Sequence, residues 1–160
     1  MTIKIGDKIP SVTLHTMTKD GPKPIASDDI FRGKKVAIFG LPGAFTPTCS
    51  AKHLPGYVKK AASLKKKGID HVVCLSVNDA FVMGAWGKDQ KVGNKVMMIA
   101  DGDATFTKAA GLELDLNGRG LGLRSQRFAM IVDKGVVKSL VFDPPGTFEK
   151  TSAEALLKQL

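Results

Sequence analysis

The sequence predicts an α/β fold with a mixed central sheet that is flanked by helices on both faces. Near-continuous apolar runs, typical of buried parallel strands, alternate with segments of helical pattern through the first part of the chain. A β-hairpin and a final helix follow them. The chain has 160 residues, of which 43% are hydrophobic and 24% charged, and it contains no internal repeat or linker. We therefore expect one globular domain over residues 1–160.

The first 35 residues are divided by glycines and prolines, which favour turns. Between them, Val12–Met17 alternates apolar and polar side chains, so this part predicts a short hairpin that leads into the core. Val36–Gly40 is entirely apolar and predicts a buried strand.

A long helix is expected to follow this strand over Thr46–Lys67. Thr46 is a suitable N-cap, and Pro47 suits the first helical position because its missing N–H would have no intrahelical partner there. Pro55 should kink the helix, and Gly68 should end it. The pattern thus predicts a strand, a sharp turn and a helix start in quick succession.

Two more strands and two more helices are expected after this helix. Ile69–Val77 is nearly all apolar, the pattern of a central parallel strand. Asn78 is expected to cap the next helix, which includes Trp86. Lys95–Ala100 predicts a third strand, and Asp103–Ala110 predicts a short helix.

In the C-terminal part, Leu112–Leu123 has several glycines and no clear period, so we expect a loop that shapes the site. The runs Arg127–Val132 and Val136–Phe142 flank a short turn and predict a β-hairpin. Thr151–Glu154 reads as a capping box that opens a helix ending at Leu160. This order of elements fits a thioredoxin-like fold.

Cys49 is the candidate reactive residue, because the expected helix start places it in the first turn. Free backbone N–H groups and the positive end of the helix dipole meet there, and both favour thiolate over thiol. The alternative is a small buried apolar residue, the commoner role of a cysteine. A core cysteine needs neither a Pro-Gly turn before it nor a helix start, so we favour a reactive thiol.

The stretch Pro42-Gly43-Ala44-Phe45-Thr46-Pro47-Thr48-Cys49-Ser50 resembles the active-site signature of the peroxiredoxins, in the form found in their type II (peroxiredoxin-5) class. Further stretches agree with that class: His53–Tyr57, Ser76–Met83 with Trp86, Ala100–Asp103, Gly111–Glu113 and Arg124–Ala129. The resemblance covers nearly the whole chain. It implies that residues 1–160 form a single thioredoxin-like peroxiredoxin domain.

The resemblance implies a thiol-specific peroxidase that reduces hydrogen peroxide and alkyl hydroperoxides without a metal, haem or flavin cofactor. The Cys49 thiolate would attack the peroxide and become a sulfenic acid, which glutaredoxin with glutathione, or thioredoxin, would reduce. Such an antioxidant enzyme serves cell redox homeostasis. The alternative is a peroxide-sensing redox relay protein that passes oxidation to a partner. The family also implies a homodimer, formed through the face around the active site.

The resemblance also assigns roles near the sulfur: Thr46 to hold a peroxide oxygen, Pro42 to shield the thiolate, and Arg127 to stabilise the thiolate and the developing charge. Each has a simpler alternative, namely a helix cap, a turn residue, and an exposed or salt-bridged arginine. His53 lies four residues after Cys49 and could pair with the thiolate. We favour a structural hydrogen bond for it instead.

Cys74 is the second of two cysteines. Its spacing from Cys49 is similar to that in plant-type members, in which a second cysteine can resolve the sulfenic acid. Its neighbours in Val72–Leu75 predict a buried strand, however, and a disulfide requires Cα atoms within about 7 Å. Bridging would then demand local unfolding unless the two sites already adjoin. We therefore favour an external thiol and keep Cys74 as the alternative resolving residue.

The formal net charge is +9, and five lysines lie between Lys59 and Lys67. No aromatic residues interleave them, so we expect an exposed helix face and no nucleic-acid site. Two cysteines without a disulfide framework favour a reducing compartment. The N-terminus shows no signal or transit peptide, and no apolar run is long enough to span a bilayer. We expect a cytoplasmic protein, with the mature form of an organellar protein as the alternative.

Overall fold

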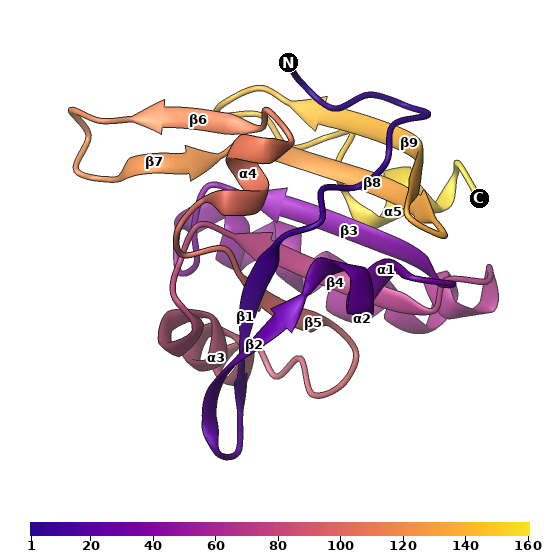
Figure 1. Cartoon of the computed structure of the whole chain (residues 1–160), viewed down its shortest axis with the longest axis horizontal. Helices are drawn as coiled ribbons and strands as arrows, with labels where there is room; N and C mark the ends of the chain where they lie inside the picture. Colours follow the sequence, from indigo (N-terminus) through magenta and orange to yellow (C-terminus); the bar gives the residue numbers. More distant parts are fainter.

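The computed structural model describes residues 1–160 and has a seven-stranded mixed sheet at its centre (Figure 1). The strand order is β2-β1-β5-β4-β3-β8-β9. Its three central strands are parallel: β3 (Lys35–Leu41), β4 (His71–Ser76) and β5 (Met97–Ala100). The outer strands pair in antiparallel fashion: β1 (Thr13–Thr18), β2 (Gly21–Ala26), β8 (Arg127–Asp133) and β9 (Val136–Asp143). The predicted α/β fold with a mixed sheet is confirmed.

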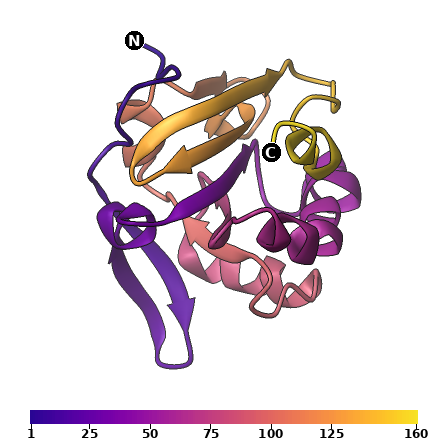
Figure 2. The same ribbon diagram turned by 90° about the vertical axis from the view of Figure 1, so that its right-hand side faces the viewer.

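Helices cover both faces of this sheet. They are α1 (Ser27–Phe31), the π-helix η1 (Cys49–His53), α2 (Leu54–Lys66), α3 (Ala80–Asp89), α4 (Thr105–Ala109) and α5 (Ala153–Leu157). Figure 2 shows α5 beside α2, and the two helices contact each other. The β1–β2 hairpin projects from the body of the molecule in both views. None of the helices combines the length and the apolarity that crossing a membrane would take.

The side chains of β3 show why the sheet needs helices on both faces. Ala37, Phe39 and Leu41 enter a core cluster with residues of η1, α2, α3 and α5. Val36 and Ile38 enter a second cluster with residues of α1 and α4. Successive side chains of a strand point to opposite faces, and here both faces are apolar. The continuous apolar run seen in the sequence is the consequence.

The structure corrects the prediction that Leu112–Leu123 is a loop. Half of this segment is strand, in a separate two-stranded ribbon of β6 (Glu113–Leu116) and β7 (Gly122–Ser125). Gly118 and Gly120 have positive φ in the connecting turn. Only four residues alternate in β6, and none of them is fully buried, so the ribbon has no apolar run to predict it.

Two predicted helix caps are displaced by one residue. Asp79, not Asn78, caps α3, and its carboxylate accepts a hydrogen bond of 2.8 Å from a helix amide. Ser152, not Thr151, caps α5, which is also shorter than predicted. Both predicted caps use their side chains in tertiary hydrogen bonds instead. A capping residue and its neighbour compete for the same role, and the sequence alone does not decide between them.

The remaining hairpins and strands agree with the prediction. The β8–β9 hairpin turns at Lys134 and Gly135, which both have positive φ (51° and 83°), as a tight hairpin requires. The first residues form the predicted β1–β2 hairpin. The lysines of Lys59–Lys67 lie on the surface: Lys60 is half-buried and the others are exposed.

Substituting Gly40 should destabilise this fold. Gly40 in β3 lies opposite Phe128 in β8, and a Cβ atom added at Gly40 would overlap the Phe128 ring. Phe128 is fully buried, so the ring cannot move without disturbing its neighbours. We expect Gly40→Ala to lower the free energy of unfolding by about 1–3 kcal/mol, measured by urea denaturation.

Gly56→Ala provides the matched control. Gly56 is helical, an added Cβ would meet no atom within 4 Å, and alanine is favoured over glycine there by about 0.5–1 kcal/mol. Equal stability of Gly40→Ala and the wild type would contradict the packing argument.

Candidate active site

Cys49 lies just beyond the carboxyl end of β3, where helical backbone begins at Pro47 as predicted. Its side chain is only 1% exposed. The Sγ atom accepts a hydrogen bond of 3.3 Å from Nη2 of Arg127, the first residue of β8. The fold thus brings together two candidate residues that are 78 positions apart in the sequence. A fixed cation beside a sulfur favours its thiolate form.

The helix that carries Cys49 is not the regular α-helix expected over Thr46–Lys67. Residues Cys49–His53 form a π-helical turn, in which the N–H of Leu54 donates to the carbonyl of Cys49, five residues back. The α-helical pattern begins at Leu54, directly before Pro55. The proline, expected to kink the helix, thus sits where the helix changes type. π-helical turns are rare and are frequently found at functional sites.

His53 is fully buried and pairs with Arg127, not with Cys49. Its Nδ1 lies 2.7 Å from Nη1 of Arg127. Because a guanidinium only donates, Nδ1 accepts, and the ring proton is on Nε2, which has no partner. Burial, and then the positive charge of Arg127, lower the pKa of His53 to about 3. The ring is therefore neutral at pH 7, and the structural hydrogen bond that we favoured for it is with Arg127.

Three aromatic rings surround the imidazole of His53. The centroids of Phe39, Tyr57 and Phe148 lie 4.9, 5.7 and 5.0 Å from the imidazole centroid. Phe148 also lies 5.9 Å from the guanidinium carbon of Arg127. Sequence reasoning missed Phe148, because nothing near it in the sequence marks a residue between β9 and α5 as a neighbour of the site.

The loop before Cys49 holds two further candidates, Thr46 and Pro42. The Thr46 hydroxyl donates to the carbonyl of Gly43 at 2.7 Å, and no helix amide donates to its oxygen, so Thr46 is not the expected side-chain cap. The carbonyl of Pro42 accepts a hydrogen bond of 3.3 Å from Arg124, whose side chain lies against Gly43. Arg124 thus supports this loop.

Asn78 anchors the same loop from the end of β4. Its Oδ1 accepts hydrogen bonds from the amide of Ala44 at 3.0 Å and from the hydroxyl of Ser76 at 2.6 Å. On the other side of Cys49, the indole of Trp86 donates to the hydroxyl of Ser50 at 3.0 Å. Asn78, just after β4, and Trp86 in α3 therefore hold the chain on both sides of the sulfur.

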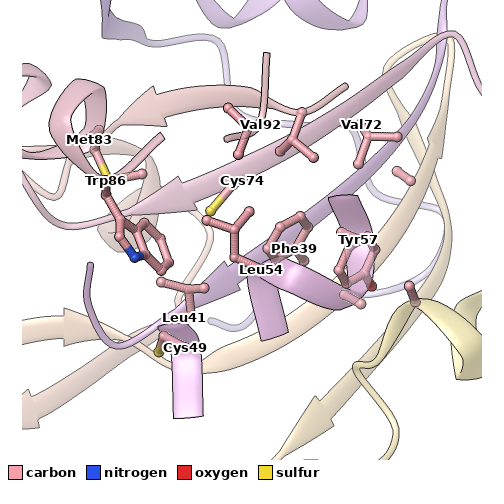
Figure 3. Close-up of a cluster of buried hydrophobic side chains, with 14 of the residues drawn as sticks. Phe39, Leu41, Cys49, Leu54, Tyr57, Val72, Cys74, Met83, Trp86 and Val92 are labelled. Carbon is pink, nitrogen blue, oxygen red and sulfur yellow. The ribbon is translucent and has the colours of Figure 1, made fainter. Parts of the chain in front are cut away.

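Cys74 lies in the middle of β4, fully buried and without a disulfide. It belongs to the same core cluster as Cys49, and Figure 3 shows Leu41 and Leu54 between the two labelled cysteines in that view. Burial, and then the negative charge of Cys49, raise the pKa of Cys74 well above its ordinary value. Its sulfur therefore stays a thiol.

The structure thus brings Cys49, Arg127 and His53 into direct contact, places Thr46 and Pro42 in the preceding loop, and keeps Cys74 in the core. No three side chains of His, Cys, Asp or Glu lie close enough together to hold a metal ion. A sulfur at a helix start with an arginine donor beside it is equipped for nucleophilic attack and for stabilising a departing anion.

Comparisons with known proteins agree with this chemistry. The Redoxin family model matches residues 4–157. Peroxiredoxin-2E, chloroplastic, from Arabidopsis thaliana is 48% identical over 99% of this chain and 70% of its own length. Peroxiredoxin-2D from the same plant is 46% identical over 99% of this chain and 98% of its own. Among solved structures, reduced Prx3 from Vibrio vulnificus in complex with H2O2 is 51% identical in sequence to this chain. Its crystal structure superposes with a TM-score of 0.94 over 99% of both chains.

The neutral state of His53 should make stability depend on pH. In the unfolded chain His53 gains a proton below its ordinary pKa of 6.5, whereas in the folded protein it stays neutral down to about 3. The unfolded state therefore binds more protons, and the fold loses up to about 1.4 kcal/mol per pH unit as the pH falls through this window.

We expect His53→Asn, measured by urea denaturation from about pH 7 to about pH 4, to lose stability less steeply than the wild type, because the proton uptake at this position is gone. Parallel curves for the two proteins would show that His53 already titrates in the folded state.

Proposed function

Because the chain belongs to the Redoxin family and is one of its peroxiredoxins, we propose that Cys49 carries its thiol peroxidase activity, with Arg127, Thr46 and Pro42 completing the site. The observation that supports this most is the 3.3 Å hydrogen bond from the Arg127 guanidinium to the Cys49 sulfur at a helix start. Hydrogen peroxide and organic hydroperoxides are the substrates, and the enzyme acts as an antioxidant.

In the proposed reaction, the Cys49 thiolate attacks one oxygen of a hydroperoxide ROOH. A sulfur–oxygen bond forms while the O–O bond breaks, and its electron pair leaves on RO⁻. This anion takes a proton from solvent and departs as an alcohol, or as water from hydrogen peroxide. Cys49 is left as a sulfenic acid. Arg127 stays charged and stabilises both the thiolate and the negative charge that moves to the departing oxygen.

Thr46 and Pro42 serve the peroxide in this proposal. The Thr46 hydroxyl donates a hydrogen bond to the Gly43 carbonyl, so its oxygen is free to accept a hydrogen bond from the peroxide. Pro42 has no N–H and presents an apolar ring, which shields the thiolate from water. Its backbone is fixed through its carbonyl by Arg124.

An external thiol returns the enzyme to its reduced form in this proposal. The thiol attacks the sulfenic sulfur and releases water, and a second thiol then reduces the mixed disulfide. Glutathione with glutaredoxin, or thioredoxin, supplies these thiols in the cytoplasm. Cys74 takes no part, because its buried, protonated sulfur is a poor nucleophile. The basic surface steers an acidic reductase towards the site.

Stopped-flow measurement of hydrogen peroxide consumption tests these roles. We expect Cys49→Ser to abolish the reaction, and Arg127→Gln to slow it by about a hundredfold or more, the usual loss when one stabilising donor is removed. Cys74→Ser should react and recycle like the wild type with at least one of the two reducing systems.

Two results would overturn parts of this proposal. Equal peroxide consumption by Cys49→Ser and the wild type would remove Cys49 from the chemistry. Loss of recycling in Cys74→Ser with both reducing systems, with the first peroxide reaction intact, would make Cys74 the resolving thiol.

We also propose a homodimer formed through the face around the active site. Phe45 in the loop before Cys49 and Phe81 on α3 are 53% and 66% exposed. The Phe45 ring lies 6.4 Å from the ring of Trp86, so Phe45 lies beside α3, the helix that carries Phe81. Large exposed apolar side chains favour burial against a second copy.

Phe81→Glu should therefore convert the dimer to a monomer, measured by light scattering after size exclusion, because a buried unpaired carboxylate is costly. Ile5→Glu is the matched control. Ile5 is 62% exposed but lies beside the first residues of β9, at the opposite end of that strand from Asp143 and Arg127. A monomeric wild type at micromolar concentration, or a dimeric Phe81→Glu variant, would contradict this interface.

A further inference from the structure

The chain that follows β9 is held by one buried carboxylate. Asp143, the last residue of β9, is 4% exposed. It accepts hydrogen bonds of 2.9–3.0 Å from the amides of Glu149, Lys150 and Thr151, and one of 2.7 Å from the Thr151 hydroxyl. Four donors on one carboxylate close residues 143–151 into a tight loop, which we name the latch segment.

Asp143 forms no ion pair with Arg127, although the two residues are neighbours on adjacent strands. Asp143 lies directly opposite Arg127 in the β8–β9 register, so the two side chains start on the same face of the sheet. An ion pair between them would be expected there, yet none forms. The only ion pairs are Lys4–Asp7 and Arg32–Asp28. The latch segment satisfies the carboxylate, which leaves the donors of Arg127 to His53 and Cys49.

The latch segment also forms one wall of the site. Its Phe148 ring packs on the His53 imidazole and lies beside the Arg127 guanidinium. Its Thr151 carbonyl accepts a hydrogen bond of 2.8 Å from the hydroxyl of Tyr57, which itself packs on His53. The donors bound by Asp143 therefore lie in the same short stretch that confines His53 and Arg127.

We propose that Asp143 is a positioning residue for the peroxidase reaction: through Phe148 and Thr151 it fixes the wall against which His53 holds Arg127 on Cys49. Asp143 forms no hydrogen bond or ion pair with Arg127 or with the sulfur. Its influence passes through the latch segment to the imidazole, and from the imidazole to the guanidinium. This inference rests on the proposed role of Arg127.

The test compares two reactions of the same thiolate. Reaction with hydrogen peroxide needs Arg127 in place to stabilise the departing oxygen anion. Alkylation of Cys49 by iodoacetamide needs the thiolate but produces no oxygen anion. Peptide mass spectrometry measures the alkylation. The rate constant for peroxide divided by the rate constant for alkylation therefore reports the position of Arg127. Partial unfolding also lowers the ratio, but through faster alkylation, because Cys49 becomes exposed; a displaced Arg127 lowers it through slower reaction with peroxide.

We expect Asp143→Asn and Phe148→Ala each to lower this ratio about tenfold through slower reaction with peroxide, the scale of a small misplacement of a catalytic group. Phe148→Tyr, which keeps the ring, should restore the wild-type ratio. If Asp143→Asn does not fold, the two Phe148 variants decide the question.

Asp101→Asn is the matched control. Asp101 is a second buried carboxylate of the same kind, which accepts hydrogen bonds from the amides of Phe106 and Thr107 and from the Thr107 hydroxyl. These partners belong to α4, whose Phe106 packs in the other core cluster from the one that holds Cys49. It should lose stability but keep the ratio.

The inference fails if Phe148→Ala keeps the wild-type ratio, or if Asp101→Asn slows the peroxide reaction as much as Asp143→Asn does. Arg127→Gln separates this failure from that of the proposed function. If Arg127→Gln leaves the ratio unchanged, the proposed role of Arg127 is wrong; if it lowers the ratio while the latch variants do not, only the inference is wrong.

Discussion

The guanidinium of Arg127 connects β8 to both ends of the π-helical turn, and the rest of the site depends on this connection. Nη2 donates to Cys49 and Nη1 to His53, so each terminal nitrogen has one fixed partner. This arrangement requires an imidazole that accepts. A protonated His53 would offer two donors to a cation and would repel it. Burial of His53 therefore does more than fill space: it keeps the ring neutral, and the neutral ring holds the arginine.

Exposure does not distinguish the two cysteines of this chain. Cys49 and Cys74 are both almost completely buried, on the same face of the sheet. What differs is the neighbouring charge. Cys49 has a cation within hydrogen-bonding distance at the start of a helix, whereas Cys74 sits among apolar side chains of a central strand. Burial without a partner disfavours a thiolate, and burial beside a fixed donor protects one.

The sequence predicts most of this fold because its central strands are buried on both faces and therefore read as apolar runs. It predicts Cys49 from the turn and helix start around it. Features that depend on tertiary partners escape such reasoning. The β6–β7 ribbon is half exposed and short, so it leaves no apolar run.

Asn78 and Thr151 look like helix caps, but the fold uses them to anchor the loop before Cys49 and to satisfy a carboxylate. His53 lies at a helical spacing from Cys49, but its partner is 74 residues away in β8. Competition between a local hydrogen bond and a distant one is decided only when the chain has folded.

Strand register explains how a distant arginine reaches this sulfur at all. Arg127 and Phe128 point to opposite faces of β8, so a slip of one residue would send the guanidinium to the side covered by α1 and α4. Phe128 lies across Gly40, and any side chain at that position would overlap its ring. The missing Cβ of Gly40 therefore fixes the place of Phe128 on β3. Arg127, the next residue along β8, is held by the same register on the face that carries Cys49.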